Sequence, residues 1–291
     1  MEMDFIIPKT LQEVLTCLNG NNGKKQIIAG GTDLVVKIRE NQILPDTVID
    51  ISEVEELAGI YEKSGFLTIG SATTLTEIAE NEIVKKHYPL LAQAAASVGA
   101  VQIRNRATVG GNVSNASPAA DTVPALIALG AIATVVSTEQ ERKVPLEELY
   151  VGVGKTVLGS NELLKSLNIS EPAENSAGVF FKLGKRKAQA ISIVNGAVQI
   201  GVDDNKCKFT HVRIAIGSVA PTVLRLKEVE ESLLGKRINR KNIETAAEIV
   251  KNKVNPITDI RATAEYRREM SCNLFMQAVY ESLNQLGISV R

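Results

Sequence analysis

The sequence is poor in the side chains that hold metals and clusters. Its 291 residues include two histidines and three cysteines, and Cys17, Cys207 and Cys272 lie far apart. Structural zinc and iron–sulfur clusters need closely spaced thiolates, usually four ligands. The sequence therefore argues against a zinc or iron–sulfur site built by this chain alone. Any metal that the working protein needs is expected in another chain.

Net charge and long apolar segments are also missing. The 33 basic residues balance the 33 acidic ones, whereas a protein that follows a nucleic-acid backbone usually carries surplus positive charge. We therefore expect no nucleic-acid partner. The longest apolar stretch, residues 124–136, contains Gly130 and is too short to span a bilayer. It predicts a buried helix followed by a strand. The first residues lack the pattern of a secretion signal, so we expect a cytoplasmic protein.

Common catalytic and nucleotide-binding motifs are absent as well. The sequence has no G-x-S-x-G elbow, no P-loop and no G-x-G-x-x-G fingerprint. His87 and His211 are isolated, and no acid–base constellation stands out. The sequence therefore gives no sign of a self-contained hydrolase.

The length and the order of the predicted elements indicate two domains. A chain of 291 residues exceeds the usual size of one domain. Strands and helices alternate in the first part, and from about Gly178 three strands are followed by three helices. The loop 170–176 is the best boundary. In the last predicted helix, residues 263–286, the spacing predicts one buried stripe. Its members are Tyr266, Met270, Leu274 and Ala278.

The first candidate binding segment is the loop at residues 27–34, a short strand followed by Gly30-Gly31 and the start of a helix. Glycines let backbone N–H groups approach a phosphate, and a helix N-terminus favours an anion. Thr32 offers a hydroxyl, whereas Asp33 would repel a diphosphate and is expected to cap the helix or to face a neutral donor. Taken alone, the loop is better explained as a tight turn between strand and helix.

The second candidate segment, residues 104–121, has adjacent glycines followed by small polar side chains. This composition suits a long, polar ligand that lies against the backbone. Asp121 could accept hydrogen bonds from ligand hydroxyls, could cap the following helix, or could do both. The basic run 182–187 is open to three interpretations: a phosphate site, a protein contact or a solvated turn.

Nine short motifs, in order along nearly the whole chain, together resemble the flavoprotein subunit of the xanthine dehydrogenase and carbon monoxide dehydrogenase family, the molybdenum hydroxylases. They are Ile28–Leu34, Asp50–Ser52, Ile69–Thr74, Gln102–Asn105, Ala107–Asn112, Ser117–Asp121, Phe181–Arg186, Ala190–Ser192 and Ile216–Thr222.

The resemblance implies an α+β fold with two domains. An FAD-binding domain, residues 1–172, would consist of two α/β subdomains (about 1–55 and 56–172) of the vanillyl-alcohol-oxidase type. A smaller C-terminal domain, residues 173–291, would combine a three-stranded antiparallel sheet with helices and cover part of the flavin.

The resemblance also implies the residues that contact FAD. The first loop would wrap the diphosphate, the second would approach it from the other subdomain, and Asp121 would bind ribityl or ribose hydroxyls. Lys182 would lie near the polar edge of the flavin and Ile191 against its ring, and none of Tyr61, Tyr88 and Tyr150 is assigned to shield the ring. The full set is Ile27, Ile28, Ala29, Gly30, Gly31, Thr32, Asp33, Leu34, Ile103, Ala107, Thr108, Gly110, Gly111, Asn112, Asp121, Leu164, Lys182 and Ile191.

The implied function is electron transfer within a complex. FAD would receive electrons from [2Fe–2S] clusters of an iron–sulfur subunit and pass them to NAD⁺, NADP⁺ or another acceptor, while a molybdopterin subunit oxidises the substrate. Two alternatives are kept: a self-contained FAD-dependent oxidase or dehydrogenase, and a non-catalytic nucleotide-binding scaffold.

Overall fold

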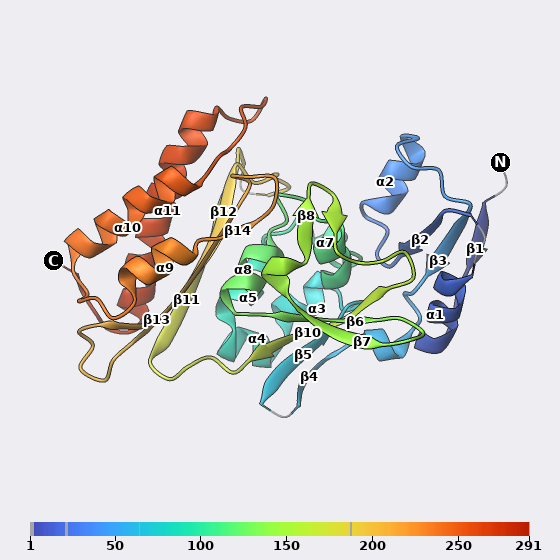
Figure 1. Cartoon of the computed structure of the whole chain (residues 1–291), viewed down its shortest axis with the longest axis horizontal. Helices are drawn as coiled ribbons and strands as arrows, with labels where there is room; N and C mark the ends of the chain where they lie inside the picture. Colours follow the sequence, from blue (N-terminus) through green and yellow to red (C-terminus); the bar gives the residue numbers. More distant parts are fainter. Residues whose placement is uncertain (1–2, 21–22, 64, 187, 291) are drawn as a thin grey trace.

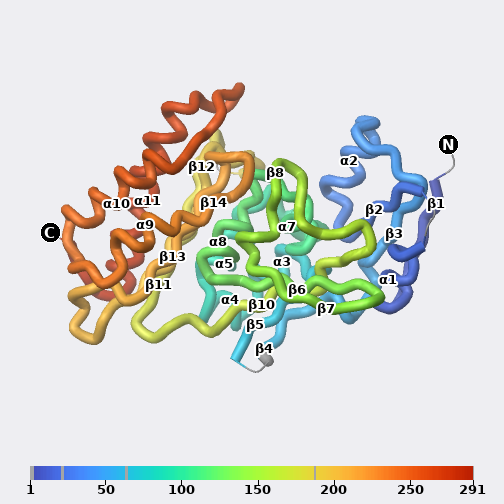
Figure 2. Tube along the Cα trace, in the orientation of Figure 1, coloured from blue at the N-terminus to red at the C-terminus, as the bar shows by residue number. Residues whose placement is uncertain are grey.

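The computed structural model describes residues 3–20, 23–63, 65–186 and 188–290. Expectations that involve Met1, Glu2, Asn21, Asn22 or Lys187 lie outside the described residues. The molecule extends from the N-terminal elements at one end to the C-terminal helices at the other (Figures 1 and 2).

The first subdomain is built on a three-stranded parallel sheet with the strand order β1-β3-β2. Its core is formed by Val14, Leu15 and Leu18 of the first helix together with Ile49 and Leu57. Strand β1 gave no sequence signal because it is three residues long and exposed throughout. The elements are β1 (Asp4–Ile6), α1 (Leu11–Asn19), β2 (Lys25–Ile28), α2 (Leu34–Arg39), β3 (Thr47–Asp50) and η1 (Glu55–Leu57).

The second subdomain has a five-stranded antiparallel sheet with the order β4-β5-β10-β6-β7. Its helices lie between this sheet and the C-terminal sheet (Figure 1), and the largest core cluster fills the space around them. Its elements are β4 (Ile60–Lys63), β5 (Phe66–Gly70), α3 (Leu75–Glu80), α4 (Glu82–His87), α5 (Pro89–Ala96), α6 (Val101–Arg104), α7 (Val109–Ser114), α8 (Thr122–Ala128), β6 (Ile132–Val136), β7 (Glu141–Pro145), η2 (Leu146–Glu148), β8 (Tyr150–Gly152), β9 (Lys155–Thr156) and β10 (Leu163–Ser170).

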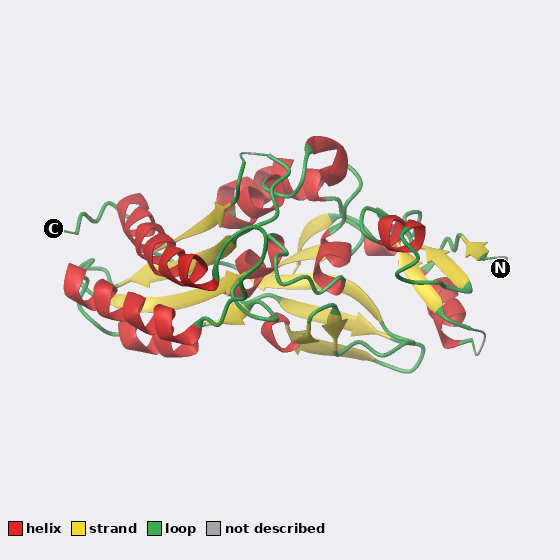
Figure 3. Ribbon diagram, turned by 90° about the horizontal axis from the view of Figure 1, so that it is seen from above, coloured by secondary structure: helices red, strands yellow, loops and turns green. Residues whose placement is uncertain are grey.

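The C-terminal part is an antiparallel sheet, β11-β12-β13-β14, with helices α9 to α11 on one face. Helices α5 and α8 pack against the other face (Figure 1), so every residue of the central strand β12 is buried. Figure 3 shows the mixture of helices (red) and strands (yellow) along the molecule. The expected three-stranded sheet is present, extended by the two-residue strand β14. The elements are β11 (Ser176–Leu183), β12 (Val194–Val202), β13 (Phe209–Gly217), β14 (Leu224–Arg225), α9 (Lys227–Leu233), α10 (Arg240–Lys253) and α11 (Ala264–Gln285).

The long apolar stretch folds as predicted, with α8 followed by β6. No helix within the described ranges is long and apolar enough to cross a membrane.

The predicted stripe on the last helix is only partly right: Ala278 is buried, and Met270 and Leu274 are half-buried against the core. Tyr266 is 46% exposed, whereas Arg267, Ser271 and Phe275 are buried. Steps of four residues advance by about 40° more than one full turn, because a helix has 3.6 residues per turn. A series of such steps therefore does not follow the buried face of the helix. Along the first turns, the buried residues lie one position later in the chain than predicted.

Candidate cofactor-binding site

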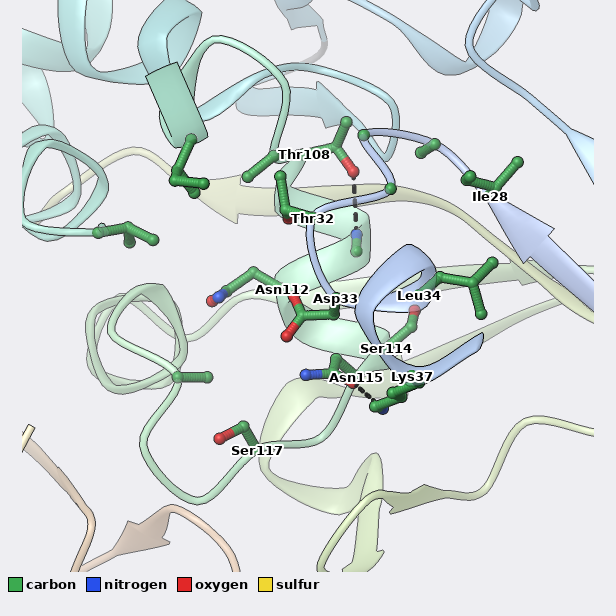
Figure 4. A pocket seen from close by; sticks show the side chains of 18 of the residues that line it. Ile28, Thr32, Asp33, Leu34, Lys37, Thr108, Asn112, Ser114, Asn115 and Ser117 are labelled. Carbon is green, nitrogen blue, oxygen red and sulfur yellow. Dashed lines mark hydrogen bonds between the residues drawn. The ribbon is translucent and has the colours of Figure 1, made fainter. Parts of the chain in front are cut away.

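The main cavity has a volume of about 1060 Å³, at the upper limit of the range of roughly 300–1,000 Å³ for small-molecule sites. It is lined by the β2–α2 loop, by α7 and the segments around it, and by the loop between β11 and β12. Figure 4 shows a close view of this pocket, with Thr32, Asp33, Asn112 and Ser117 among the labelled side chains. The two segments singled out in the sequence therefore line one space.

The β2–α2 loop presents backbone donors to this cavity. The N–H groups of Gly30, Gly31, Thr32 and Asp33 donate to no group in the described part of the chain. Buried or half-buried backbone N–H groups normally have a partner. Four consecutive free donors beside a cavity suit the oxygens of a diphosphate. Asp33 stands at the N-cap position of α2, but its side chain makes no capping hydrogen bond.

The glycines of the two loops have different roles. A Cβ on Gly30 would lie 1.8 Å from the carbonyl oxygen of Arg106, so this glycine lets the two subdomains meet. Gly31 has a φ of +73°, which favours glycine. A Cβ on Gly110 would collide with Ser71, whereas one on Gly111 would meet only the Thr108 hydroxyl, at 3.1 Å. Of the two adjacent glycines in α7, Gly111 is therefore the one that opens onto the cavity.

Helix α7 supplies side chains rather than free amides. The hydroxyl of Thr108 accepts a hydrogen bond from the Gly111 N–H at 3.1 Å and caps the helix. The Nζ of Lys37 on α2 donates to Oδ1 of Asn115 at 2.6 Å and ties the two subdomains together beside the cavity (Figure 4). Residues 109–114 form a helix although two glycines within six residues disfavour one.

Asp121 is buried, and both of its carboxylate oxygens have partners. Oδ1 accepts from Ser192 Oγ at 2.6 Å and from Asn195 Nδ2 at 2.8 Å. Oδ2 lies 2.5 Å from the Nζ of Lys182, which also donates to the carbonyl of Ser97. Asp121 makes no side-chain hydrogen bond that caps α8, so the expected cap is wrong. Its contact with cofactor hydroxyls stays a prediction.

Most of the residues expected to contact FAD line the cavity. The structure brings together Ile27, Ile28, Ala29, Gly30, Gly31, Thr32, Asp33, Leu34, Ile103, Ala107, Thr108, Gly111, Asn112, Asp121 and Ile191. Three others do not line it. Leu164 is only 2% exposed and belongs to the core beneath the sheet. Gly110 packs against Ser71, and the ammonium group of Lys182 is paired with Asp121, which itself lines the cavity.

Several lining residues escaped the sequence analysis. They are mostly small residues in turns: Val98, Gly99, Ala100, Gly154, Gly159, Ser160, Gln189 and Ala190. The glycines among them are the signal that could have been used, since each marks a turn. Glu162 also lines the cavity, and hydrogen bonds from the Arg142 guanidinium hold the pKa of its carboxyl below the usual range.

The donor set fits a dinucleotide cofactor. Free amides for a diphosphate, polar side chains along α7, and the aliphatic Ile103 and Ile191 surround one cavity. The aliphatic side chains suit a flat ring, and the polar groups suit sugar or ribityl hydroxyls.

Comparison with known proteins agrees with this chemistry. Residues 1–172 match the model for the FAD-binding domain in molybdopterin dehydrogenase, and residues 179–282 match that for the carbon monoxide dehydrogenase flavoprotein C-terminal domain. The nicotinate dehydrogenase FAD-subunit of Eubacterium barkeri is 33% identical, over 98% of this chain and 97% of that protein. The putative xanthine dehydrogenase FAD-binding subunit of Escherichia coli (strain K12) is 31% identical, over 96% and 95%.

Solved structures show the same fold over the whole chain. A chain of carbon monoxide dehydrogenase from Hydrogenophaga pseudoflava aligns with a TM-score of 0.93 and 27% identity, covering 98% of both chains. A chain of quinoline 2-oxidoreductase from Pseudomonas putida 86 aligns with a TM-score of 0.91 and 25% identity, covering 99% of both. The protein is therefore an oxidoreductase subunit, and it belongs to the family of FAD-binding subunits of the xanthine, nicotinate and carbon monoxide dehydrogenases, the molybdenum hydroxylases.

Proposed function

We propose that this chain carries electrons through one bound FAD, from iron–sulfur clusters of a partner subunit to NAD⁺, NADP⁺ or another acceptor. Bound FAD supplies the redox chemistry, because a flavin can exchange electrons singly with clusters and in pairs with a nicotinamide. The names of relatives, such as FAD-subunit and medium chain, support a role as one subunit among several. A molybdopterin subunit is part of the same proposal.

The chain's own residues bind and orient the cofactor. The amides of Gly30, Gly31, Thr32 and Asp33 would donate to the diphosphate, with the Thr32 side chain close by. Asn112 of α7 would hold hydroxyl groups from the opposite side. Because these groups come from both subdomains, which the Gly30–Arg106 approach brings together, the cofactor would lie across their junction.

The proposal that a pyridine nucleotide is the electron acceptor rests on the solvent exposure of the aliphatic side chains in the cavity. Ile191 is 57% exposed and Ile103 is 41% exposed, although both line the cavity. A ring bound against them would keep part of one face open to solvent. A flat nicotinamide could approach such a face, which is the geometry that hydride transfer requires.

Anaerobic titration of the FAD-loaded chain with NADH and, separately, with NADPH tests the proposal. Bleaching of the visible flavin absorbance by either nucleotide would support a pyridine-nucleotide acceptor. Absorbance that persists with both but is lost with dithionite would move the acceptor to another class. Turnover of a substrate by the isolated chain, without partner subunits, would favour the self-contained oxidase or dehydrogenase instead.

A further inference from the structure

Arg267, in the first turn of α11, is buried with 3% exposure. Among the described residues it is the only lysine or arginine in the buried class. A guanidinium removed from water is costly unless its donors are paired. The groups that pair it therefore identify what this side chain stabilises.

The partners of Arg267 come from three loops. Nη1 donates to the carbonyl oxygen of Ile193 at 2.6 Å and to that of Ser218 at 3.2 Å. Nη2 donates to Oδ1 of Asp259 at 2.7 Å. Asp259 lies in the α10–α11 loop and also accepts from the N–H and the guanidinium of Arg261. One side chain thus joins the β11–β12, β13–β14 and α10–α11 connections.

The β11–β12 loop is the connection that reaches the cofactor site. Ala190 and Ile191 line the cavity, and the loop is closed where the Ile193 N–H donates to the Leu183 carbonyl at 2.7 Å. The Gln189 N–H donates to the carbonyl of Gly99, another lining residue, at 3.2 Å. The loop therefore forms one wall of the cavity.

Neighbouring residues at the end of this loop are held by opposite parts of the molecule. Ser192 donates to Asp121 of the FAD-binding part, and Ile193 accepts from Arg267 of the C-terminal helix. Without Arg267, the Ile193 carbonyl and the Asp259 carboxylate would lose a charged donor, and the end of the loop would be held only by Asp121 and by its backbone bond to Leu183.

We propose that Arg267 is a positioning residue for the flavin: from the far side of the sheet it fixes the end of the β11–β12 loop, and so places Ala190 and Ile191 against the cofactor. Preformed binding surfaces lower the ordering cost of binding. Arg267 therefore acts on FAD affinity and on the flavin environment without touching the cofactor. This inference depends on FAD binding and is independent of the electron acceptor.

The test uses the full chain with three variants and one control. Arg267→Lys keeps the charge but lacks the planar fork that reaches three acceptors. Arg267→Met removes the charge, and Asp259→Asn weakens its ion pair while keeping the side-chain shape. Cys272→Ala is the control, because Cys272 is buried on the same helix but contacts α10 through the Ala247 carbonyl.

Hydrogen exchange of the apo chain and FAD titration measure the effect. The Arg267 variants should exchange the amide protons of Gln189 and Ile193 faster and bind FAD about tenfold more weakly, which corresponds to about 1.4 kcal/mol. Asp259→Asn should do the same to a smaller extent, and the flavin reduction potential should shift in Arg267→Lys. Cys272→Ala should lower the melting temperature and change none of these.

Unchanged exchange and unchanged FAD affinity in the Arg267 variants, with a lower melting temperature, would overturn the proposal and leave a purely stabilising role. If Arg267→Met does not fold, Arg267→Lys and Asp259→Asn decide by the same measurements. Equal losses of FAD affinity in these variants and in Cys272→Ala would also overturn it.

Discussion

Asp121 and Lys182 form an ion pair of 2.5 Å between the FAD-binding part and the C-terminal sheet, and their side chains are only 8% and 14% exposed. Lys182 stands near the end of β11, and Asp121 directly precedes α8. The pair joins the two parts of the chain beside the cofactor cavity, where Asp121 is itself a lining residue.

Breaking this pair should destabilise the apo protein strongly. Asp121→Asn leaves Lys182, whose side chain is only 14% exposed, without a counter-charge, and removing one partner of a buried pair costs about 3–5 kcal/mol. Urea unfolding of the apo chain measures the loss. Glu82→Gln is the control, because the Glu82–Lys85 pair has Glu82 88% exposed and exposed pairs contribute about 0–1 kcal/mol. Equal stability of the two variants would contradict this assignment.

The glycines of the two loops should separate folding from cofactor binding. Gly30→Ala places a Cβ against the Arg106 carbonyl and forces the backbone apart. It should cost about 2–3 kcal/mol of apo stability and also FAD affinity. Gly152→Ala is the matched control, since a Cβ there meets nothing within 4 Å. An apo stability of Gly30→Ala equal to that of the control would show that the loops can move apart freely.

Gly111→Ala should weaken FAD binding without lowering the stability of the apo chain. Its Cβ would meet only the Thr108 hydroxyl, at 3.1 Å, which a small shift of that side chain can relieve, and alanine is the better helix former by about 1 kcal/mol. The apo chain should therefore keep its melting temperature, while FAD, measured by titration, binds at least about tenfold more weakly because the cavity is narrowed. Unchanged FAD affinity would mean that the cofactor does not approach this part of α7.

His211 should make the protein sensitive to acid. Burial, together with the charges of Arg213 and Arg225, lowers the pKa of His211 below its usual value. The imidazole therefore binds a proton more readily in the unfolded chain than in the folded one. Its contribution to the free energy of unfolding is present above about pH 6.5 and is lost as the pH falls through the folded-state pKa. In His211→Gln the loss of unfolding free energy between about pH 7.5 and pH 5 should be smaller than in the wild type.

His87→Gln serves as the control for that measurement, because His87 is exposed. An acid-induced loss of stability in His211→Gln as large as in the wild type and in the control would contradict the assignment to His211.

Local sequence predicted the elements whose signal is local. Helix α2 begins directly after the Gly30-Gly31 turn, as the sequence predicts. Helix α3 has a similarly local signal, because Thr74 and Glu77 form a capping box. Strand β10, Leu163–Ser170, was missed although it lies at the centre of the five-stranded sheet. Its polar Asn168 makes its shortest hydrogen bonds to Thr68 and Thr134 of the neighbouring strands, which are distant in sequence.

In the candidate site, too, some features have a local sequence signal and others form only when distant residues meet. Both glycine-containing segments could be identified because turn chemistry is local. The functions of their glycines could not, since the Gly30–Arg106 approach joins residues of different subdomains. The partners of Asp121 were also hidden, because Lys182, Ser192 and Asn195 belong to strands and a loop that meet it only in the folded chain.

The central claim is that the β2–α2 loop holds the FAD diphosphate with its free amides. Hydrogen exchange at Gly30, Gly31, Thr32 and Asp33, compared between the apo chain and the chain saturated with FAD, tests this claim most directly. We expect these amide protons to exchange quickly in the apo chain and to become strongly protected when one FAD is bound. Exchange at these four positions that is unchanged on saturation with FAD would contradict it.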